Sequence, residues 1–199
     1  DGSALEERVK TLWGGDDKQY DKFTKAGKVS YASLPGFDLM GKVVASSSET
    51  PFANFIKKLN ATDWVRQGHT HFAGQTDGKC PYCQQKLPVS FEDDLLKCFD
   101  AQYQEDIAAI SNFQSVYVSE MSSLVRTFES NLDDVLPGLN AVEYQTKVKN
   151  FKDAITINTQ RIEAKVKEPT TVASLEDTDS LLLEIGSIID QMNVQIEAH

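Results

Sequence analysis

Two cysteines stand two residues apart in the stretch GKCPYCQQKLP, residues 78–88. A thiol pair at this spacing can exchange with a disulfide, or it can supply two of the four ligands that a tetrahedral zinc ion requires. Gly78 before the pair favours a tight turn, and Leu87 after it is an apolar residue that can pack against that turn. The pattern therefore predicts a knuckle whose chemistry is either redox exchange or metal binding.

The redox interpretation has a specific structural requirement. Cys80-Pro81-Tyr82-Cys83 is identical to the active-site tetrapeptide of glutaredoxins. In that chemistry the first thiol lies at a helix N-terminus directly after a buried strand, because the helix dipole lowers the thiol pKa. The preceding residues, AGQTDGK, cannot form a buried strand. A dithiol oxidoreductase with Cys80 as nucleophile is therefore the alternative function.

Zinc, the predicted cofactor, needs two ligands besides these cysteines. Three sets of residues could supply them. Two copies of the chain could meet and share one ion through four thiolates. His69 and His71, a short distance upstream, could join Cys80 and Cys83 within one chain. Cys98 is a third source, although its leucine and phenylalanine neighbours favour a buried structural thiol.

Other catalytic patterns find little support. The stretch from Gly36 to Lys42 satisfies G-x-x-x-x-G-K, but Val43 follows where a phosphate-binding loop has Ser or Thr for magnesium, so we interpret the match as chance. No Walker B pattern is present, and the three histidines suggest no Ser-His-Asp or Cys-His arrangement. We expect this chain by itself not to be an enzyme.

Composition narrows the class of protein further. The chain has 199 residues, a formal net charge of -10, 40% hydrophobic and 25% charged residues. An acidic chain is a poor ligand for phosphate backbones, so no direct nucleic-acid binding is expected. No apolar run reaches the length of a membrane span. An odd number of cysteines does not suggest a secreted disulfide framework, and a reducing, cytoplasmic compartment is predicted.

The elements that would position the thiols fall into two parts, 1–89 and 90–199. The first part predicts short helices over 5–13, 16–26 and 51–60, the last with Ser48 or Thr50 as its cap and Pro51 in its first turn. A further turn would direct Trp64 and Val65 inward. The knuckle would end this irregular helical part, which we treat as a subdomain.

Residues 90–199 predict long antiparallel helices. Apolar residues recur every three or four positions from Leu96 to Leu132, which predicts one long helix capped at Ser90. Leu136-Pro137-Gly138 would end it, and a second helix would begin after Asn140. A third helix carries apolar residues in 3-4 spacing, namely Leu182, Ile185, Ile189, Met192 and Ile196. The fold class is therefore mainly α, ending in a coiled-coil-like hairpin or three-helix array.

The stretch from Asn60 to Asp106 resembles the central insert of bacterial P-loop ATPases related to the anticodon nucleases RloC and PrrC. Trp64, Val65 and Gly68 match a W-V-x-x-G pattern, and residues 80–85 match C-P-[FY]-C-x-Q. The segments NTQRIEAK and NVQIEAH also resemble the return helices of that family. Residues 80–87 are similar, in the pattern C-P-x-C-x-x-x-L, to the zinc hook at the coiled-coil apex of DNA-repair ATPases.

The resemblance implies a structural insert of an ATPase whose knuckle sets the end of a helical arm or joins two molecules through zinc. The partners it implies are a second copy of the chain and the remainder of the parent ATPase. No nuclease or ATPase residue of the family has a counterpart in this sequence, so none is assigned here.

Overall fold

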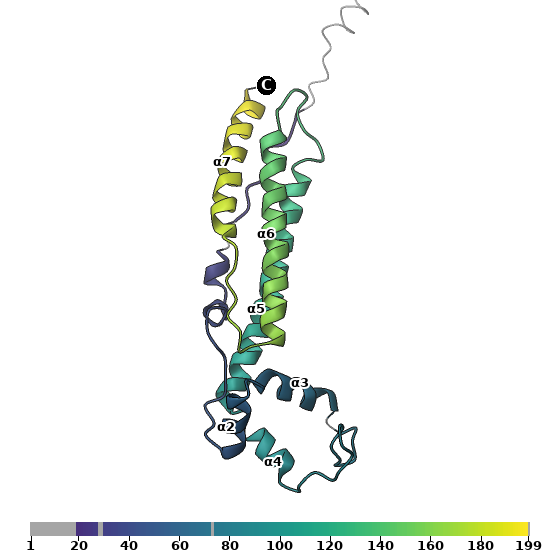
Figure 1. Cartoon of the computed structure of the whole chain (residues 1–199). Coiled ribbons are helices and arrows are strands. Elements are labelled where there is room, and N and C mark those ends of the chain that lie inside the picture. Colours follow the sequence, from purple (N-terminus) through teal and green to yellow (C-terminus); the bar gives the residue numbers. More distant parts are fainter. Residues whose placement is uncertain (1–18, 28–29, 73, 199) are drawn as a thin grey trace, which may run out of the picture.

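The computed structural model describes residues 19–27, 30–72 and 74–198 and is mainly α-helical, as the sequence predicts. Three long helices, α5 (Ala101–Ser130), α6 (Val142–Lys167) and α7 (Thr178–Glu197), form what we call the stalk (Figure 1). The short helices α2 (Pro51–Lys58), α3 (Thr62–Phe72) and α4 (Phe91–Leu96), together with the knuckle at 76–88, form the tip. Among the described residues, the only β pairing is an isolated antiparallel bridge between Lys79 and Lys86.

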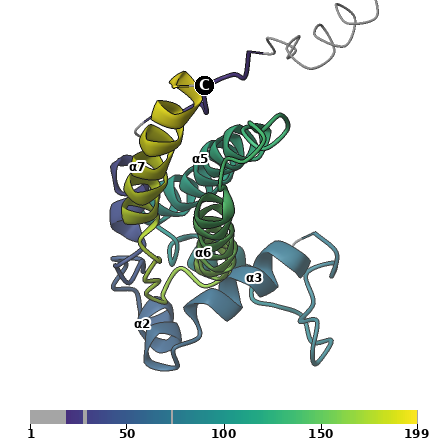
Figure 2. The same ribbon diagram turned by 90° about the horizontal axis from the view of Figure 1, so that it is seen from above.

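The stalk helices run up, down and up, and α6 packs against both α5 and α7 (Figures 1 and 2). A helix of 30 residues is about 45 Å long, so the tip is well separated from the end at which α7 finishes. The predicted helical period is confirmed, because one face of α5 is fully buried. That face consists of Tyr103, Ile110, Phe113, Tyr117, Met121, Leu124 and Phe128.

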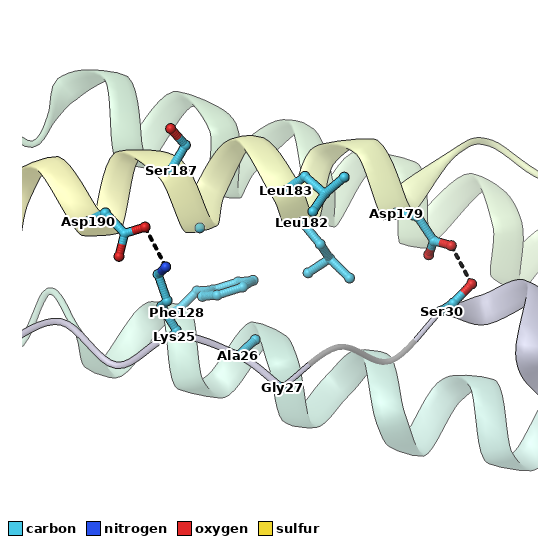
Figure 3. Close-up of a pocket in the computed structure, with 11 residues that line it drawn as sticks. Lys25, Ala26, Gly27, Ser30, Phe128, Asp179, Leu182, Leu183, Ser187 and Asp190 are labelled. Carbon is cyan, nitrogen blue, oxygen red and sulfur yellow. Dashed lines mark hydrogen bonds and ion pairs between the residues drawn. The ribbon is translucent and has the colours of Figure 1, made fainter.

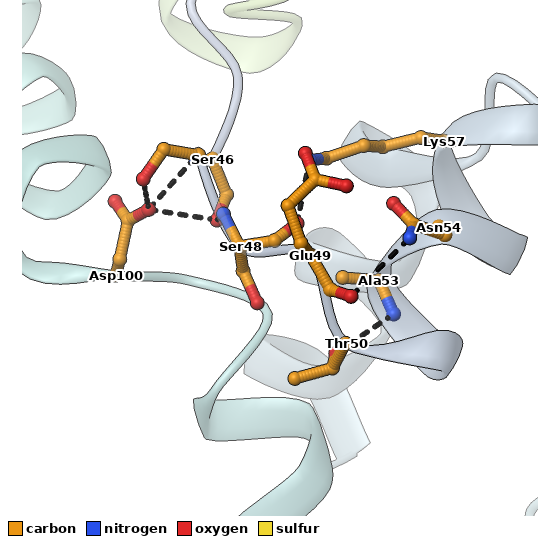
Figure 4. A network of polar contacts seen from close by, with 9 residues as sticks. Ser46, Ser48, Glu49, Thr50, Ala53, Asn54, Lys57 and Asp100 are labelled. Atoms are coloured by element: carbon orange, nitrogen blue, oxygen red, sulfur yellow. Dashed lines mark hydrogen bonds and ion pairs between the residues drawn. The ribbon is translucent and has the colours of Figure 1, made fainter.

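The prediction of one long helix from Ser90 is wrong at its beginning. The chain forms α4, turns at 97–100, and starts again as α5. Asp100 causes the restart: one carboxylate oxygen accepts a hydrogen bond from the Tyr103 amide at 2.9 Å. The other accepts from the Ser46 hydroxyl and from the amide and hydroxyl of Ser47 (Figure 4). The break lets α4 fold back onto α2, which a continuous helix would prevent.

An extended segment, residues 19–27, lies along α5 and α7 where a helix over 16–26 was expected; residues 16–18 and the expected helix over 5–13 lie outside the described residues. The Asn193 amide accepts from the Phe23 N–H at 2.7 Å and donates to the Phe23 carbonyl at 2.9 Å. Asn131 binds the amide and carbonyl of Thr24 in the same way, at 2.7 and 3.0 Å. Each asparagine therefore satisfies the backbone groups that a neighbouring strand would otherwise satisfy.

Lys25 of this segment and Ser30, which follows it in the sequence, each contact α7, and the two contacts flank a pocket (Figure 3). The Lys25 ammonium lies 2.5 Å from the Asp190 carboxylate, and the Ser30 hydroxyl donates to Asp179. Phe23 is buried in the stalk core, with its ring edge against Tyr144. This contact pattern explains why the residues are extended: their side chains and backbone are held by the stalk helices.

The G-x-x-x-x-G-K stretch packs on the stalk and has no phosphate-loop geometry. Gly36 adopts a φ of +90°, and a Cβ there would lie 2.6 Å from the carbonyl oxygen of Ala109 in α5. The following residues form a 3-10 turn, η2 (Phe37–Leu39), and Lys42 pairs with Asp38 at 2.6 Å. Another 3-10 turn, η1 (Tyr31–Ser33), precedes it. Gly36 is therefore required by close backbone packing, and the motif match is chance.

Tip and stalk meet at the C-terminal end of α6. The Arg66 guanidinium donates to the Lys167 carbonyl at 2.7 Å, and Gln67 donates to the same oxygen at 2.8 Å. The buried Asp63 carboxylate accepts from the amide and hydroxyl of Thr170. The last carbonyl groups of a helix have no hydrogen-bond donor within that helix. Side chains of α3 supply such donors at the C-terminal end of α6.

Candidate metal site at the tip

The knuckle is a tight turn closed by backbone hydrogen bonds. The Cys80 amide donates to the Gln85 carbonyl at 2.8 Å, and the Gln84 amide donates back to the Cys80 carbonyl at 2.9 Å. The Leu87 amide donates to the Gly78 carbonyl at 2.8 Å, which closes the base of the turn. Gly78 has a φ of 70° and Gln84 a φ of 61°, so the expected role of Gly78 in the turn is confirmed.

Both thiols are free, and neither is buried. The backbone N–H of Cys83, followed by that of Tyr82, lowers the pKa of the Cys80 thiol, and the Cys83 side chain contributes further. Amide donors aimed at a thiol stabilise the thiolate, which is the form that binds a metal and also the form that attacks a disulfide. No helix begins at Cys80, so the lowered pKa comes from the turn itself and not from a helix dipole.

His69 and His71 belong to the last turn of α3. His69 is held by Glu92 of α4, with 2.9 Å between its Nε2 atom and a carboxylate oxygen. The His71 ring lies edge-on to Phe72, with centroids 4.8 Å apart. Within the described ranges, no three His, Cys, Asp or Glu side chains are grouped as a metal site would require. Completion of the site by His69 and His71 stays a prediction that these contacts do not favour.

Cys98 is separate from the knuckle. It is buried against Ala53 and Ile56 of α2, and its thiol donates to the Asp94 carbonyl. Burial raises the pKa of this thiol, which makes it a poor ligand and a poor nucleophile. The prediction of a buried structural thiol is confirmed.

An apolar cavity of about 330 Å³, which we call the tip groove, lies between α2, α3, α4 and the knuckle. Its knuckle wall is formed by Thr76, Cys80, Pro81, Tyr82 and Leu87. Trp64 was expected to face inward, but it is 60% exposed and its ring stacks on Tyr82 with centroids 5.8 Å apart. The expectation failed because the inward positions of α3 are used by Asp63, which is buried at the stalk junction, and by Val65, which packs on the α2 cluster.

Two residues of this site were not predicted from the sequence. Tyr82 forms part of the wall of the tip groove, and Glu92 contacts His69. Tyr82 lies between the two cysteines, so its type was visible but its stacking partner was not. Glu92 follows Ser90, the expected cap of one long helix, and only the break at 97–100 brings α4 back toward α3. The signal that could have predicted this return is Asp100 followed by Ala101, a capping residue before a helix former.

A family model described as an AAA domain matches residues 2–199. The chain belongs to this AAA domain family, a family of P-loop ATPases. None of the curated proteins matches the chain, and no solved structure does. In the part of the chain that the structure describes, none of the helices is both long and apolar enough to span a bilayer.

Proposed function

We propose that this chain is a non-catalytic helical insert of an AAA-family ATPase, and that its tip joins two copies through one zinc ion. Cys80 and Cys83 of each copy would hold the ion. When bound, zinc would supply a tetrahedral link with four thiolate ligands. The ATPase chemistry, the remainder of the parent protein and any nucleic-acid substrate would lie outside this chain.

The observation that supports the proposal most directly is the position of the exposed thiol turn. The turn lies at the tip, and the far end of α7 lies at the opposite end of the stalk (Figure 1). A donor set of two free thiols, stabilised as thiolate by backbone amides, fits half of a structural zinc site. Because His69 is already held by Glu92, a second copy is the better source of the other two ligands.

The test is metal analysis of the purified chain combined with molecular mass in solution, with and without a chelator. We expect half a mole of zinc per chain and dimers that dissociate when the chelator removes the metal. The double variant Cys80→Ser, Cys83→Ser should lose the zinc. Cys98→Ala, which removes the buried thiol, is the matched control and should retain it.

Two results would contradict the proposal. One mole of zinc per monomer, lost in His69→Ala, would assign the site to a single chain. Absence of metal together with a readily reduced Cys80-Cys83 disulfide would support dithiol exchange, the alternative that the lowered pKa of Cys80 favours.

A further inference from the structure

The tip carries an apolar surface that its own fold leaves uncovered. Phe55 on α2 and Leu59, the residue that follows its last turn, are four positions apart and are 58% and 57% exposed. They line the tip groove together with Trp64 and Tyr82, which are also exposed. The groove lining is dominated by aromatic and aliphatic side chains. Exposed apolar surface of this kind, gathered around a cavity, is typical of an interaction site.

The thiol turn and this apolar surface cannot be separated in space. Cys80, Pro81 and Tyr82 are themselves part of the groove wall. A zinc ion shared by two chains holds its four sulfur atoms about 2.3 Å from the metal, so the two knuckles must touch. Two chains in that arrangement must therefore also bring the neighbouring apolar surfaces close together.

The distribution of charge favours contact between two tips over contact between two stalks. Residues 100–198, which include the three stalk helices, contain seventeen Asp and Glu against seven Lys and Arg. Residues 47–72 and 74–99, which include the tip, contain six of each. Two stalks side by side would repel each other, whereas two tips carry no net charge and can approach at ordinary ionic strength.

We infer that the rim of the tip groove, formed by Phe55, Leu59, Trp64 and Tyr82, is a self-association surface that binds the same surface of a second copy. This inference rests on the proposed function and adds to it a contact that does not involve the metal. An apolar isologous contact around the ion stabilises the dimer and excludes water from the thiolates. The rim therefore sets the strength of the dimer, and zinc sets its geometry.

The experiment measures the dimer dissociation constant by analytical ultracentrifugation of the zinc-loaded chain, with zinc content determined on the same samples. The variant is Phe55→Ser with Leu59→Ser, because both side chains are exposed on the rim and neither belongs to the knuckle that carries the thiols. We expect the dissociation constant to rise tenfold or more, roughly the effect of removing central apolar anchors. Leu183→Ser on α7, where the side chain is 66% exposed, is the matched control and should leave the constant unchanged.

Zinc content tests the shared metal site, and the dimer dissociation constant tests the rim. A double variant that retains half a mole of zinc per chain and dimerises as tightly as the unmodified chain would overturn the rim and leave the shared site intact. Equal weakening by Leu183→Ser would also overturn it, since the surface would then not be confined to the tip. Loss of zinc stoichiometry in the unmodified chain would instead contradict the proposed function. Helical circular dichroism of each variant confirms that the fold is retained.

Discussion

Lys165 is a single residue that joins three segments of the molecule. Its ammonium is fully buried and donates to the carbonyls of Lys42, Pro169 and Thr171 at 2.5, 2.7 and 2.5 Å. Burial lowers the pKa of this lysine, while Asp63 nearby acts in the opposite direction. Three carbonyl acceptors satisfy all three N–H bonds of the ammonium, so the buried cation is compensated by dipoles and not by an ion pair.

Replacing Lys165 by Met should destabilise the chain strongly. Met keeps the apolar volume but leaves three carbonyl oxygens without a donor, and we expect a loss of about 2–4 kcal/mol in the free energy of unfolding. Urea denaturation followed by circular dichroism measures it. Lys149→Met, which removes an exposed ion pair with Asp153, is the control and should cost less than about 1 kcal/mol. A similar small cost for Lys165→Met would contradict the role assigned to its three contacts.

At the scale of elements, the start of α5 depends on one carboxylate. The Ser47 hydroxyl, then the Tyr103 amide, together with the Ser47 amide and the Ser46 hydroxyl, hold the pKa of Asp100 at about 2 against an ordinary value of 3.8. Because the folded-state pKa is lowered, the ionised form is stabilised by folding. Its contribution is complete above pH 4 and is lost as the pH falls through about 2.

The lowered pKa predicts that the unmodified chain and Asp100→Asn differ in their free energy of unfolding by an amount that depends on pH. At pH 7 the variant should be less stable by roughly 1–2 kcal/mol, because an amide caps less well and cannot reproduce the charge-assisted bonds. Between pH 4 and pH 2 the difference should shrink, since the unmodified carboxyl is then being protonated. Urea unfolding at several pH values measures this difference. A gap that stays constant over that range would show that the charge of Asp100 is not what stabilises the cap.

The asparagine contacts show how helices and extended segments are combined in this fold. Asn158 is fully buried; it donates to the Glu176 carbonyl and accepts from the Glu176 amide. Asn193 and Asn131 make the same pair of bonds to Phe23 and Thr24. Asn158 and Asn193 are the first residues of the segments NTQRIEAK and NVQIEAH. Their role in this chain is to bind extended backbone to helices.

For the whole molecule, tip and stalk differ in how much apolar surface they bury. The stalk core is one continuous cluster that reaches from Phe23 to Met192, whereas the separate tip cluster consists of Ala53, Ile56 and Cys98. Local opening costs least where few apolar contacts are buried. The tip should therefore open more readily than the stalk.

Hydrogen exchange followed by mass spectrometry should show this order. Amides of α2 and α4 should exchange faster than those of α5 around Phe113 and Tyr117, by about tenfold or more. Zinc should slow exchange at 76–88, because binding to the folded turn stabilises it. Exchange in α2 as slow as in the centre of α5 would contradict this separation.

The sequence by itself determined the helical class, the three stalk helices and the turn that holds the thiols. These features depend on local rules: the apolar period along α5 and α7, the cap at Thr50, and the left-handed φ that Gly78 permits. The chemistry of two thiols at C-x-x-C spacing also follows from the residues alone.

Only the tertiary structure decided the break at 97–100, the extended course of 19–27, and the position of His69 and Trp64. Each depends on partners distant in sequence: Ser46 and Ser47 for Asp100, Asn131 and Asn193 for the extended segment, Glu92 for His69, and Tyr82 for Trp64. Local propensity cannot predict such contacts. A segment whose sequence has a helical period becomes extended only when side-chain amides from distant parts of the chain bind its backbone. The groove beside the thiols arises in the same way, from helices that the break at Asp100 allows to meet.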